Sequence, residues 1–288
     1  MSELKLTRRS LVTASAAALL PSLPSFATAS TLAEIKARGF MTVATEDDFA
    51  PFEFIKDGKP QGFSHEAVAE LKKWAKVEVR QDILPWTGLL AAVSAGKYDT
   101  AITGSIVTDE RLQAFDFAPP TASGTHYAIV RAGESRVKTV ADLKGLTVGV
   151  QAGGAQLARL PELAAMLKRT GGAVGKVVEY QSYPEAYADL ANGRLDFVIN
   201  TIVGAQTLVR SRPKVFALSV PVSSAGFHAW PVPKGNETLL NFLTDFVTHL
   251  RTSGKLAEMQ TKWFGQAFPT LPTGPIKSVE QFRALTAS

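Results

Sequence analysis

Short apolar runs alternate with amphipathic segments along most of the chain, which is the pattern of a protein built from strand and helix units. A capping box of Thr31 and Glu34 predicts a first helix, and the alternation over residues 52–63 around Asp57-Gly58 predicts a hairpin. Buried strands are expected at the apolar runs 40–45, 77–84, 100–103, 146–150, 176–180 and 197–200. This order of elements predicts an α/β fold.

One stretch of this pattern occurs twice. The segment from Ala92 to Thr103 matches the segment from Asp189 to Asn200 in its glycine, its basic residue, its aspartate and its isoleucine. Each copy places the glycine where a helix should end, and the aspartate, Asp99 or Asp196, where a strand opens. The copies lie 97 residues apart (189 − 92), which is too far for a solenoid repeat. The spacing predicts two lobes of like construction.

The two lobes should be joined by chain crossings. The expected parts are a discontinuous first lobe over 30–124 and 227–267, a second lobe over 125–226 and a Pro- and Thr-rich surface tail over 268–288. Extended segments at 125–131 and 226–233 are the expected crossings, and they should act as the hinge. Within the second lobe, a box of Ser182 and Glu185 is expected to begin the helix 184–192.

The N-terminus predicts export. Arg8 and Arg9 precede the apolar run 11–20, and a small-residue cleavage site ends at Ala29, which together indicate a twin-arginine signal peptide over residues 1–29. No later stretch approaches the ~20 apolar residues of a membrane span. The mature protein is therefore expected in the periplasm as a monomer.

Composition removes several classes of chemistry. The chain has no cysteine, which excludes disulfides, a thiol nucleophile and thiolate metal ligation. The formal net charge is +5, but the basic residues are scattered, so no nucleic-acid partner is expected. The histidines lie far apart without metal-ligand spacing, so neither a metal nor a cofactor is expected; they are His65, His126, His228 and His249.

Arg111 is the central candidate for binding. Thr108 should cap a helix that places Arg111 in its first turn, directly after a strand and the turn Gly104-Ser105. Loops at the carboxyl ends of strands bind ligands in open α/β folds, and a guanidinium fork suits a carboxylate. The alternative, a local pairing of Arg111 with Glu110 or Asp116, stays open.

The other strand ends supply aromatic walls, glycine turns and hydrogen-bonding side chains, the mixture expected of a small-molecule cleft. Beside Arg111, the candidate ligand-contacting residues are Glu46, Phe49, Phe52, Trp86, Thr103, Gly104, Ser105, Ile106, Gln151, Gly154, Asn200 and Thr201. Core packing is an equal explanation for the aromatic members. Neither a nucleophile elbow nor a pair of carboxylates indicates catalysis, so no enzyme is expected.

These motifs together resemble the extracytoplasmic solute-binding proteins of polar amino acid ABC transporters, family 3. The resemblance runs from about Phe40 to Gly265. Its markers are Ala-Thr-Glu-Asp-Asp-Phe-Ala-Pro-Phe-Glu-Phe at 44–54, Gly-Phe at 62–63, Thr-Asp-Glu-Arg at 108–111, Phe-Asp-Phe at 115–117, Asp-Leu-Lys-Gly at 142–145, Gln151 and Lys-Trp-Phe-Gly at 262–265. The resemblance implies a type II periplasmic-binding-protein-like fold, two open α/β sheets joined by two hinge strands that close on a ligand.

The resemblance also implies roles. Arg111 would bind the ligand carboxylate together with backbone N–H groups near Ile106 and Gly154, and Phe49 and Trp86 would hold the ligand between them. The side chain of the ligand would face the residues Glu46, Gln151 and Asn200. The ligand would be an amino acid or a related small carboxylate, and the partner an ABC transporter permease in the inner membrane.

The sequence departs from the family at the amine side. Thr201 stands where many amino acid binders have an aspartate that neutralises the ammonium of the ligand, and Ile106 stands where they often have a threonine. Either Glu46 compensates, or the ligand lacks a free amine. A cyclohexadienyl dehydratase-like enzyme on the same fold is the alternative of a different class, and a receptor sensor domain is a third.

Overall fold

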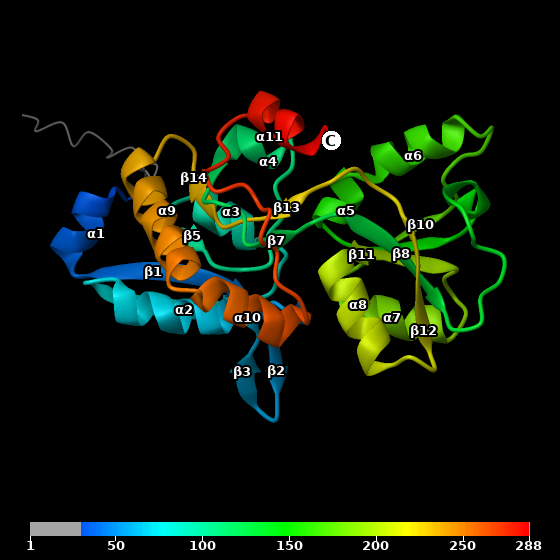
Figure 1. The fold of residues 1–288 in the computed structure, drawn as a ribbon, viewed down its shortest axis with the longest axis horizontal. Helices are drawn as coiled ribbons and strands as arrows, with labels where there is room; N and C mark the ends of the chain where they lie inside the picture. Colours follow the sequence, from blue (N-terminus) through cyan, green and yellow to red (C-terminus); the bar gives the residue numbers. More distant parts are fainter. Residues whose placement is uncertain (1–29, 288) are drawn as a thin grey trace, which may run out of the picture.

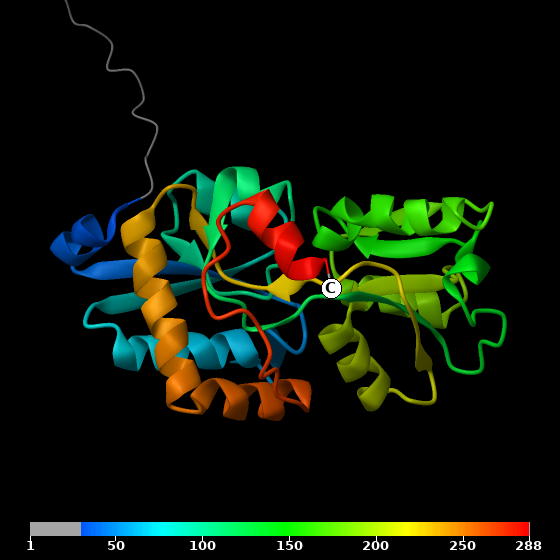
Figure 2. The same cartoon turned by 45° about the horizontal axis from the view of Figure 1, so that its top comes forward.

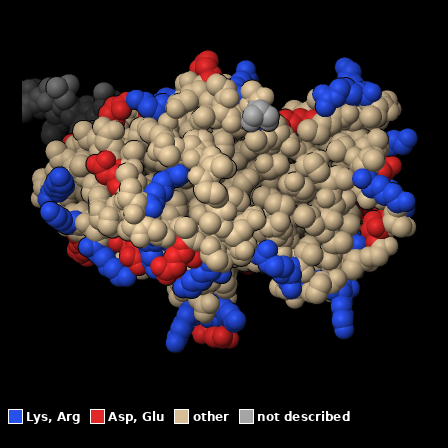
Figure 3. Space-filling view, in the orientation of Figure 1, with Lys and Arg blue, Asp and Glu red and all other residues tan. Residues whose placement is uncertain are grey.

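The computed structural model describes residues 30–287 and shows two lobes of strands and helices side by side (Figure 1). The expected signal peptide lies outside the described residues. Within 30–287, none of the helices combines the length and the apolar character that a membrane crossing requires. On the face shown in Figure 3, basic and acidic side chains are scattered over both lobes.

The first lobe combines segments from both ends of the chain. Its elements are α1 (Leu32–Arg38), β1 (Phe40–Glu46), β2 (Phe54–Lys56), β3 (Lys59–Gln61), α2 (Phe63–Trp74), β4 (Glu78–Leu84), α3 (Leu89–Ser94), β5 (Thr100–Ala101), α4 (Arg111–Ala114), β6 (Phe115–Phe117), β14 (Pro231–Pro233), α9 (Glu237–Thr252) and α10 (Lys255–Phe264). Three parallel strands form its sheet in the order β4-β1-β5. Helices α1 and α3 pack on β1, α2 packs on β4, and α10 contacts both α2 and α9. The predicted capping box of Thr31 and Glu34 begins α1.

The second lobe is built from one continuous stretch of chain. Its elements are β8 (His126–Arg131), the 3₁₀ turn η1 (Val140–Leu143), β9 (Val148–Gln151), α5 (Ala155–Ala158), α6 (Leu160–Lys168), β10 (Val177–Tyr180), α7 (Tyr183–Ala191), β11 (Phe197–Thr201), α8 (Ile202–Ser211) and β12 (Phe216–Pro221). The strand order is β10-β9-β11-β8-β12; β10, β9 and β11 are parallel, and β8 runs antiparallel to both of its neighbours. The predicted box at α7 is wrong, because Ser182 occupies the N-cap without a side-chain capping bond.

Two short strands, β7 (Ala122–Ser123) and β13 (Phe227–His228), pair antiparallel where the chain passes between the lobes (Figure 2). Just beyond them, the N–H of Gly124 donates to the carbonyl of Gly226 (2.7 Å). The first crossing therefore lies earlier than the predicted segment 125–131, most of which is β8 in the sheet of the second lobe. The second crossing falls at the start of the predicted 226–233. The lobe boundaries themselves stay a prediction.

The repeated sequence segment has the same structural task in both lobes. In the first lobe, the carboxylate of Asp99 accepts from the backbone N–H of Thr42 (2.6 Å), at the start of β1. In the second, the carboxylate of Asp196 accepts from the backbone N–H of Thr147 (2.9 Å), directly before β9. Each aspartate thus ties the central parallel strand of its sheet to the strand that it opens, which explains why the two segments match.

The C-terminal segment is not a surface tail, contrary to the prediction. Ile276 is fully buried and exchanges backbone hydrogen bonds with Phe117 (2.9 Å each). A last helix, α11 (Val279–Thr286), follows, and its Phe282 packs against Phe227 of the crossing with the ring centroids 6.3 Å apart. Apolar residues spaced through a Pro-rich stretch dock this segment on the first lobe, and α11 lies at the junction of the lobes in both views (Figures 1 and 2).

Candidate ligand-binding site

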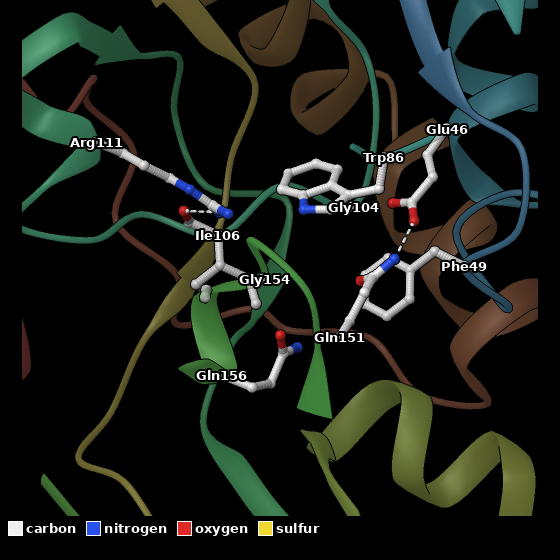
Figure 4. A pocket seen from close by; sticks show the side chains of 10 residues that line it. Glu46, Phe49, Trp86, Gly104, Ile106, Arg111, Gln151, Gly154 and Gln156 are labelled. Atoms are coloured by element: carbon white, nitrogen blue, oxygen red, sulfur yellow. Dashed lines mark hydrogen bonds between the residues drawn. The ribbon is translucent and has the colours of Figure 1, made fainter. Parts of the chain in front are cut away.

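A cavity of about 10 Å³ lies between the lobes, where strand ends of both sheets meet (Figure 4). Its lining consists of Glu46, Phe49, Trp86, Gly104, Ile106, Arg111, Gln151, Gly154, Ala155 and Gln156. Ala155 and Gln156 were not predicted from the sequence, and every other lining residue was. A ligand of amino acid size does not fit into so small a space. Entry of a ligand of amino acid size therefore requires the lobes to separate.

Arg111 lies at one end of the cavity, in the first turn of α4 (Figure 4). Its backbone N–H donates to the hydroxyl of Thr108 (3.1 Å), although Glu110, and not the predicted Thr108, is the N-cap of α4. Its Nη1 donates to the carbonyl of Ile106 (2.9 Å). Burial lowers the pKa of Arg111 to about 10, so the side chain is a cation at neutral pH. Within 30–287 no ion pair joins Arg111 to Glu110 or Asp116, the open alternative, although the charge of Glu110 acts on Arg111 and raises its pKa; Asp116 pairs with Lys234 instead (2.9 Å).

The lobes touch through several contacts around the cavity. The indole N–H of Trp86 donates to the carbonyl of Gly153 (3.1 Å), and Nη2 of Arg111 approaches the same oxygen (3.3 Å). The guanidinium carbon of Arg111 lies 4.9 Å from the Trp86 ring centroid. Phe49 stacks on Tyr183 of the second lobe with the centroids 5.4 Å apart. The arrangement described is therefore a closed one, in which Gly153 receives two donors from the first lobe.

Glu46 and Gln151 form the opposite end of the cavity. Nε2 of Gln151 donates to Oε1 of Glu46 (2.7 Å), which joins the end of β9 to the end of β1 (Figure 4). Glu46 is only 2% exposed. Burial, and after it the charge of Glu53, raises the pKa of the Glu46 carboxyl well above its ordinary value. A cationic group brought next to Glu46 would restore the charged form.

A second buried acid supports the wall of the cavity from behind. Oε1 of Glu53 accepts from the hydroxyl of Thr103 (2.5 Å) and from the backbone N–H of Gly104 (3.0 Å). Burial raises the pKa of Glu53 to about 7. Gly104 has no room for a side chain, because a Cβ there would lie 2.5 Å from the ring of Phe49. Glu53 and Gly104 thus set the position of the loop that carries Ile106.

Thr201 does not line the cavity, and its hydroxyl is bonded to His228 of the second crossing. Nδ1 of His228 lies 2.7 Å from the carbonyl of Gly104, and a carbonyl only accepts, so Nδ1 carries the proton. Nε2 of His228 then accepts from the hydroxyl of Thr201 (3.1 Å). Burial lowers the pKa of His228 to about 3, which keeps the ring neutral. One chain of bonds thus connects the first lobe, the crossing and the second lobe.

Four further predicted residues also lie outside the lining. Asn200 is buried, donates to the hydroxyl of Tyr187 (2.6 Å) and accepts from the N–H of Thr201 (2.7 Å). Phe52 packs against the His228 ring at 4.2 Å. Thr103 is bonded to Glu53, and Ser105 is buried. These side chains support the site from behind its walls.

The second lobe adds a residue that the sequence reasoning missed. Gln156 follows the turn at Gly154 and is 3% exposed, with its amide facing the cavity (Figure 4). A Cβ at Gly154 would lie 2.5 Å from Oε1 of Gln156, so the glycine makes room for this amide. The N–H of Gly154 itself donates to the carbonyl of Gln151 (3.0 Å), which closes the turn. No motif signals Gln156; only its place one residue into a helix after a strand end does.

Two α/β lobes that meet at a cavity walled by an arginine and two aromatic rings define a binding protein that closes on a small ligand. Residues 41–266 match the sequence profile of the bacterial extracellular solute-binding proteins, family 3. The chain belongs to this family. The fold and the class of function that the sequence motifs implied are therefore confirmed.

Individual relatives agree with this assignment. The L-cystine-binding protein TcyJ of Escherichia coli K12 is 32% identical, over 90% of this chain and 96% of that protein. The ABC transporter arginine-binding protein 1 of the same strain is 25% identical, over 76% and 88%. The crystal structure of the ancestral amino acid-binding protein AncCDT-1, described as a precursor of cyclohexadienyl dehydratase, is 25% identical, covers 82% of this chain and 100% of that chain, and has a TM-score of 0.70.

Proposed function

We propose that this protein captures an α-amino acid in the periplasm and delivers it to an ABC importer. The observation that carries the proposal is the position of Arg111, a cation that faces a closed cavity between the lobes of a family 3 solute-binding protein. The names of the relatives, which specify cystine, arginine or amino acids in general, support an amino acid ligand. The name of the arginine-binding relative supports the ABC importer as partner. Periplasmic location agrees with the export signal expected at residues 1–29.

The carboxylate of the ligand binds to Arg111. Its two bonds to carbonyl oxygens hold the guanidinium in place, and a guanidinium has five N–H donors, so others remain for a carboxylate. Trp86 and Phe49 line the cavity beside it and supply the apolar walls between which the ligand backbone fits. The same groups close the lobes, so ligand binding and closure are one event.

The cationic part of the ligand lies toward Glu46. This carboxyl is the acid among the cavity-lining residues, and an ammonium next to it would offset its burial. Because Thr201 does not line the cavity, it does not supply the acceptor that an aspartate would supply at its position. Of the two alternatives, we therefore propose that Glu46 neutralises the ammonium of the ligand, and not that the ligand lacks a free amine. L-cystine, the ligand named for the relative with 32% identity, is the first candidate.

Calorimetry on the mature protein, with L-cystine, L-arginine and the other proteinogenic amino acids, tests the proposal. We expect saturable binding of at least one of them, with recovery of the unchanged ligand by mass spectrometry. Small-angle scattering should show a more compact protein when that ligand is saturating, because the lobes must open to admit it. Turnover of a cyclohexadienyl acid would favour the enzyme alternative, which the dehydratase precursor among the structural relatives raises. Absence of binding by every amino acid tested would contradict the proposal.

A further inference from the structure

The amide of Gln156 is a buried acceptor that faces the cavity. The side chain is 3% exposed and lines the site. Its Oε1 has no hydrogen-bond partner among residues 30–287. Leaving a buried carbonyl oxygen without a donor is unfavourable, so a residue held in this state at a binding site indicates that a ligand supplies the donor.

Several other acceptors around the cavity already have donors. The carbonyl of Gly104 accepts from His228, and the carbonyl of Ile106 accepts from Arg111. Oε1 of Glu46 accepts from Gln151. Among the lining side chains that the structure describes, Gln156 is the one with a fully buried acceptor that has no partner, and this acceptor is available to an incoming N–H group.

The absence of a side chain at Gly154 leaves room for this amide. Because a Cβ at position 154 would come within 2.5 Å of Oε1, any larger residue there would displace the amide from the cavity. Gly154 is thus required for the close approach of Gln156 to the site.

We propose that Gln156 is a specificity-determining residue that accepts a hydrogen bond from the amino group of the ligand. The inference rests on the proposed function, because it requires a ligand with an amine. In this chain the second lobe then recognises the amine through a neutral carbonyl oxygen, while the charge of the ammonium is balanced from the first lobe by Glu46. The task that an aspartate at position 201 would perform is divided between two residues on opposite walls.

A ligand pair isolates this contact. L-cystine and 3,3′-dithiodipropionate share the disulfide and both carboxylates and differ only in the amino groups. Gln156→Met keeps the length of the side chain and removes the acceptor. By calorimetry we expect Gln156→Met to weaken L-cystine binding by about tenfold and to change the binding of 3,3′-dithiodipropionate less than about twofold. If wild type prefers L-arginine, the matched pair is L-arginine and 5-guanidinopentanoate, with the same expectation.

Two more variants keep the test decisive. Gln156→Glu adds a charge to the same position, so it should bind L-cystine at least as tightly as wild type and reject the diacid. Gln206→Met, a half-buried glutamine on α8 away from the cavity, controls for the loss of a glutamine and should change neither ligand.

Equal losses for the amino acid and its deaminated analogue in Gln156→Met would overturn the role of Gln156 and leave the proposed function intact. A wild type that binds the deaminated analogue more tightly than the amino acid would overturn the role as well. Failure of wild type to bind any amino acid would contradict the proposed function, and the inference with it.

Discussion

The two walls of the cavity differ in kind. The first lobe contributes both charged groups, Arg111 and Glu46, and the large ring of Trp86. The second lobe contributes the neutral amides of Gln151 and Gln156, on either side of a glycine turn. Coulombic attraction acts over a longer distance than a hydrogen bond, so a zwitterionic ligand should settle on the first lobe and be enclosed by the second. The difference separates capture, which needs charge, from discrimination, which needs matched donors and acceptors.

Removing the cation of the first lobe, Arg111, should have the largest effect on ligand affinity. Arg111→Ala should weaken amino acid binding by about 2–5 kcal/mol, because it leaves a buried carboxylate without its partner. Arg111→Lys should recover only part of the loss, since an ammonium lacks the planar fork. Titration calorimetry measures both. An Arg111→Ala protein with wild-type affinity would show that the carboxylate does not bind there.

The acid of the first lobe should make binding depend on pH. The pKa of Glu46 is raised in the free protein, and a bound ammonium favours the ionised carboxylate and so lowers that pKa. Binding then releases a proton, and affinity should rise with pH below the raised pKa, by at most about tenfold per pH unit. Glu46→Gln should bind more weakly and lose this dependence.

Calorimetry between about pH 5 and 7, where α-amino groups stay protonated, in buffers of different ionisation enthalpy gives both the affinity and the proton count. A flat wild-type profile without proton release would contradict the placement of the ammonium beside Glu46.

Glu53, which lies behind the cavity wall, should affect the stability of the protein rather than ligand binding. The pKa of Glu53 is raised to about 7 in the folded protein from an ordinary 4.5, so the folded state holds its proton more tightly than the unfolded state. Its contribution to the free energy of unfolding is thus complete below about pH 4.5 and falls as the pH rises toward 7, by roughly 3 kcal/mol at most. Urea unfolding of wild type and Glu53→Gln across this range should show a smaller decline in the variant. Parallel curves would contradict the raised pKa.

Removing the hydrogen bond between Trp86 and Gly153, which joins the two walls, should have the smallest effect on ligand affinity. Trp86→Phe keeps an aromatic ring and removes the N–H that reaches Gly153 in the closed form. One such bond contributes roughly 1 kcal/mol, so ligand affinity should fall by about fivefold. An unchanged dissociation rate, measured by stopped-flow fluorescence, would show that this bond does not hold the lobes together.

The sequence predicted the residues that sit at the carboxyl ends of strands, because parallel strands bring these ends to one edge of a sheet. Glu46, Trp86 and Gln151 reached the cavity for this reason. Asn200 and Thr201 stand at an equivalent strand end, yet their side chains are bonded to Tyr187 and His228. Such partners are remote in the sequence, so no local sequence pattern predicts them.

Other features depended on tertiary packing, which leaves no periodic pattern in the sequence. Gln156 points into the site only because Gly154 leaves room for it. The C-terminal segment has the composition of a loop, and two well-spaced apolar residues, Leu271 and Ile276, dock it on the first lobe. At Ser182 the sequence signature of a capping box is present and the capping bond is not. Local rules thus located the elements of the fold, and tertiary contacts decided which side chains face the ligand.

The route of the chain through the crossings sets an order of folding. The second lobe, from β8 to β12, is one uninterrupted stretch, whereas in the first lobe β6 pairs with β14 through Phe117 and Pro231, which lie 114 residues apart (231 − 117). The longest pairing inside the second lobe, Tyr127 with Pro221, spans 94 residues (221 − 127), so the order of the segments along the chain, and not the loop length, separates the two lobes. During synthesis the early strands must wait for the segment that begins with β13 and β14, in about the last fifth of the chain, while the second lobe can already be complete. A chaperone that shields nascent chains would be needed most in that interval.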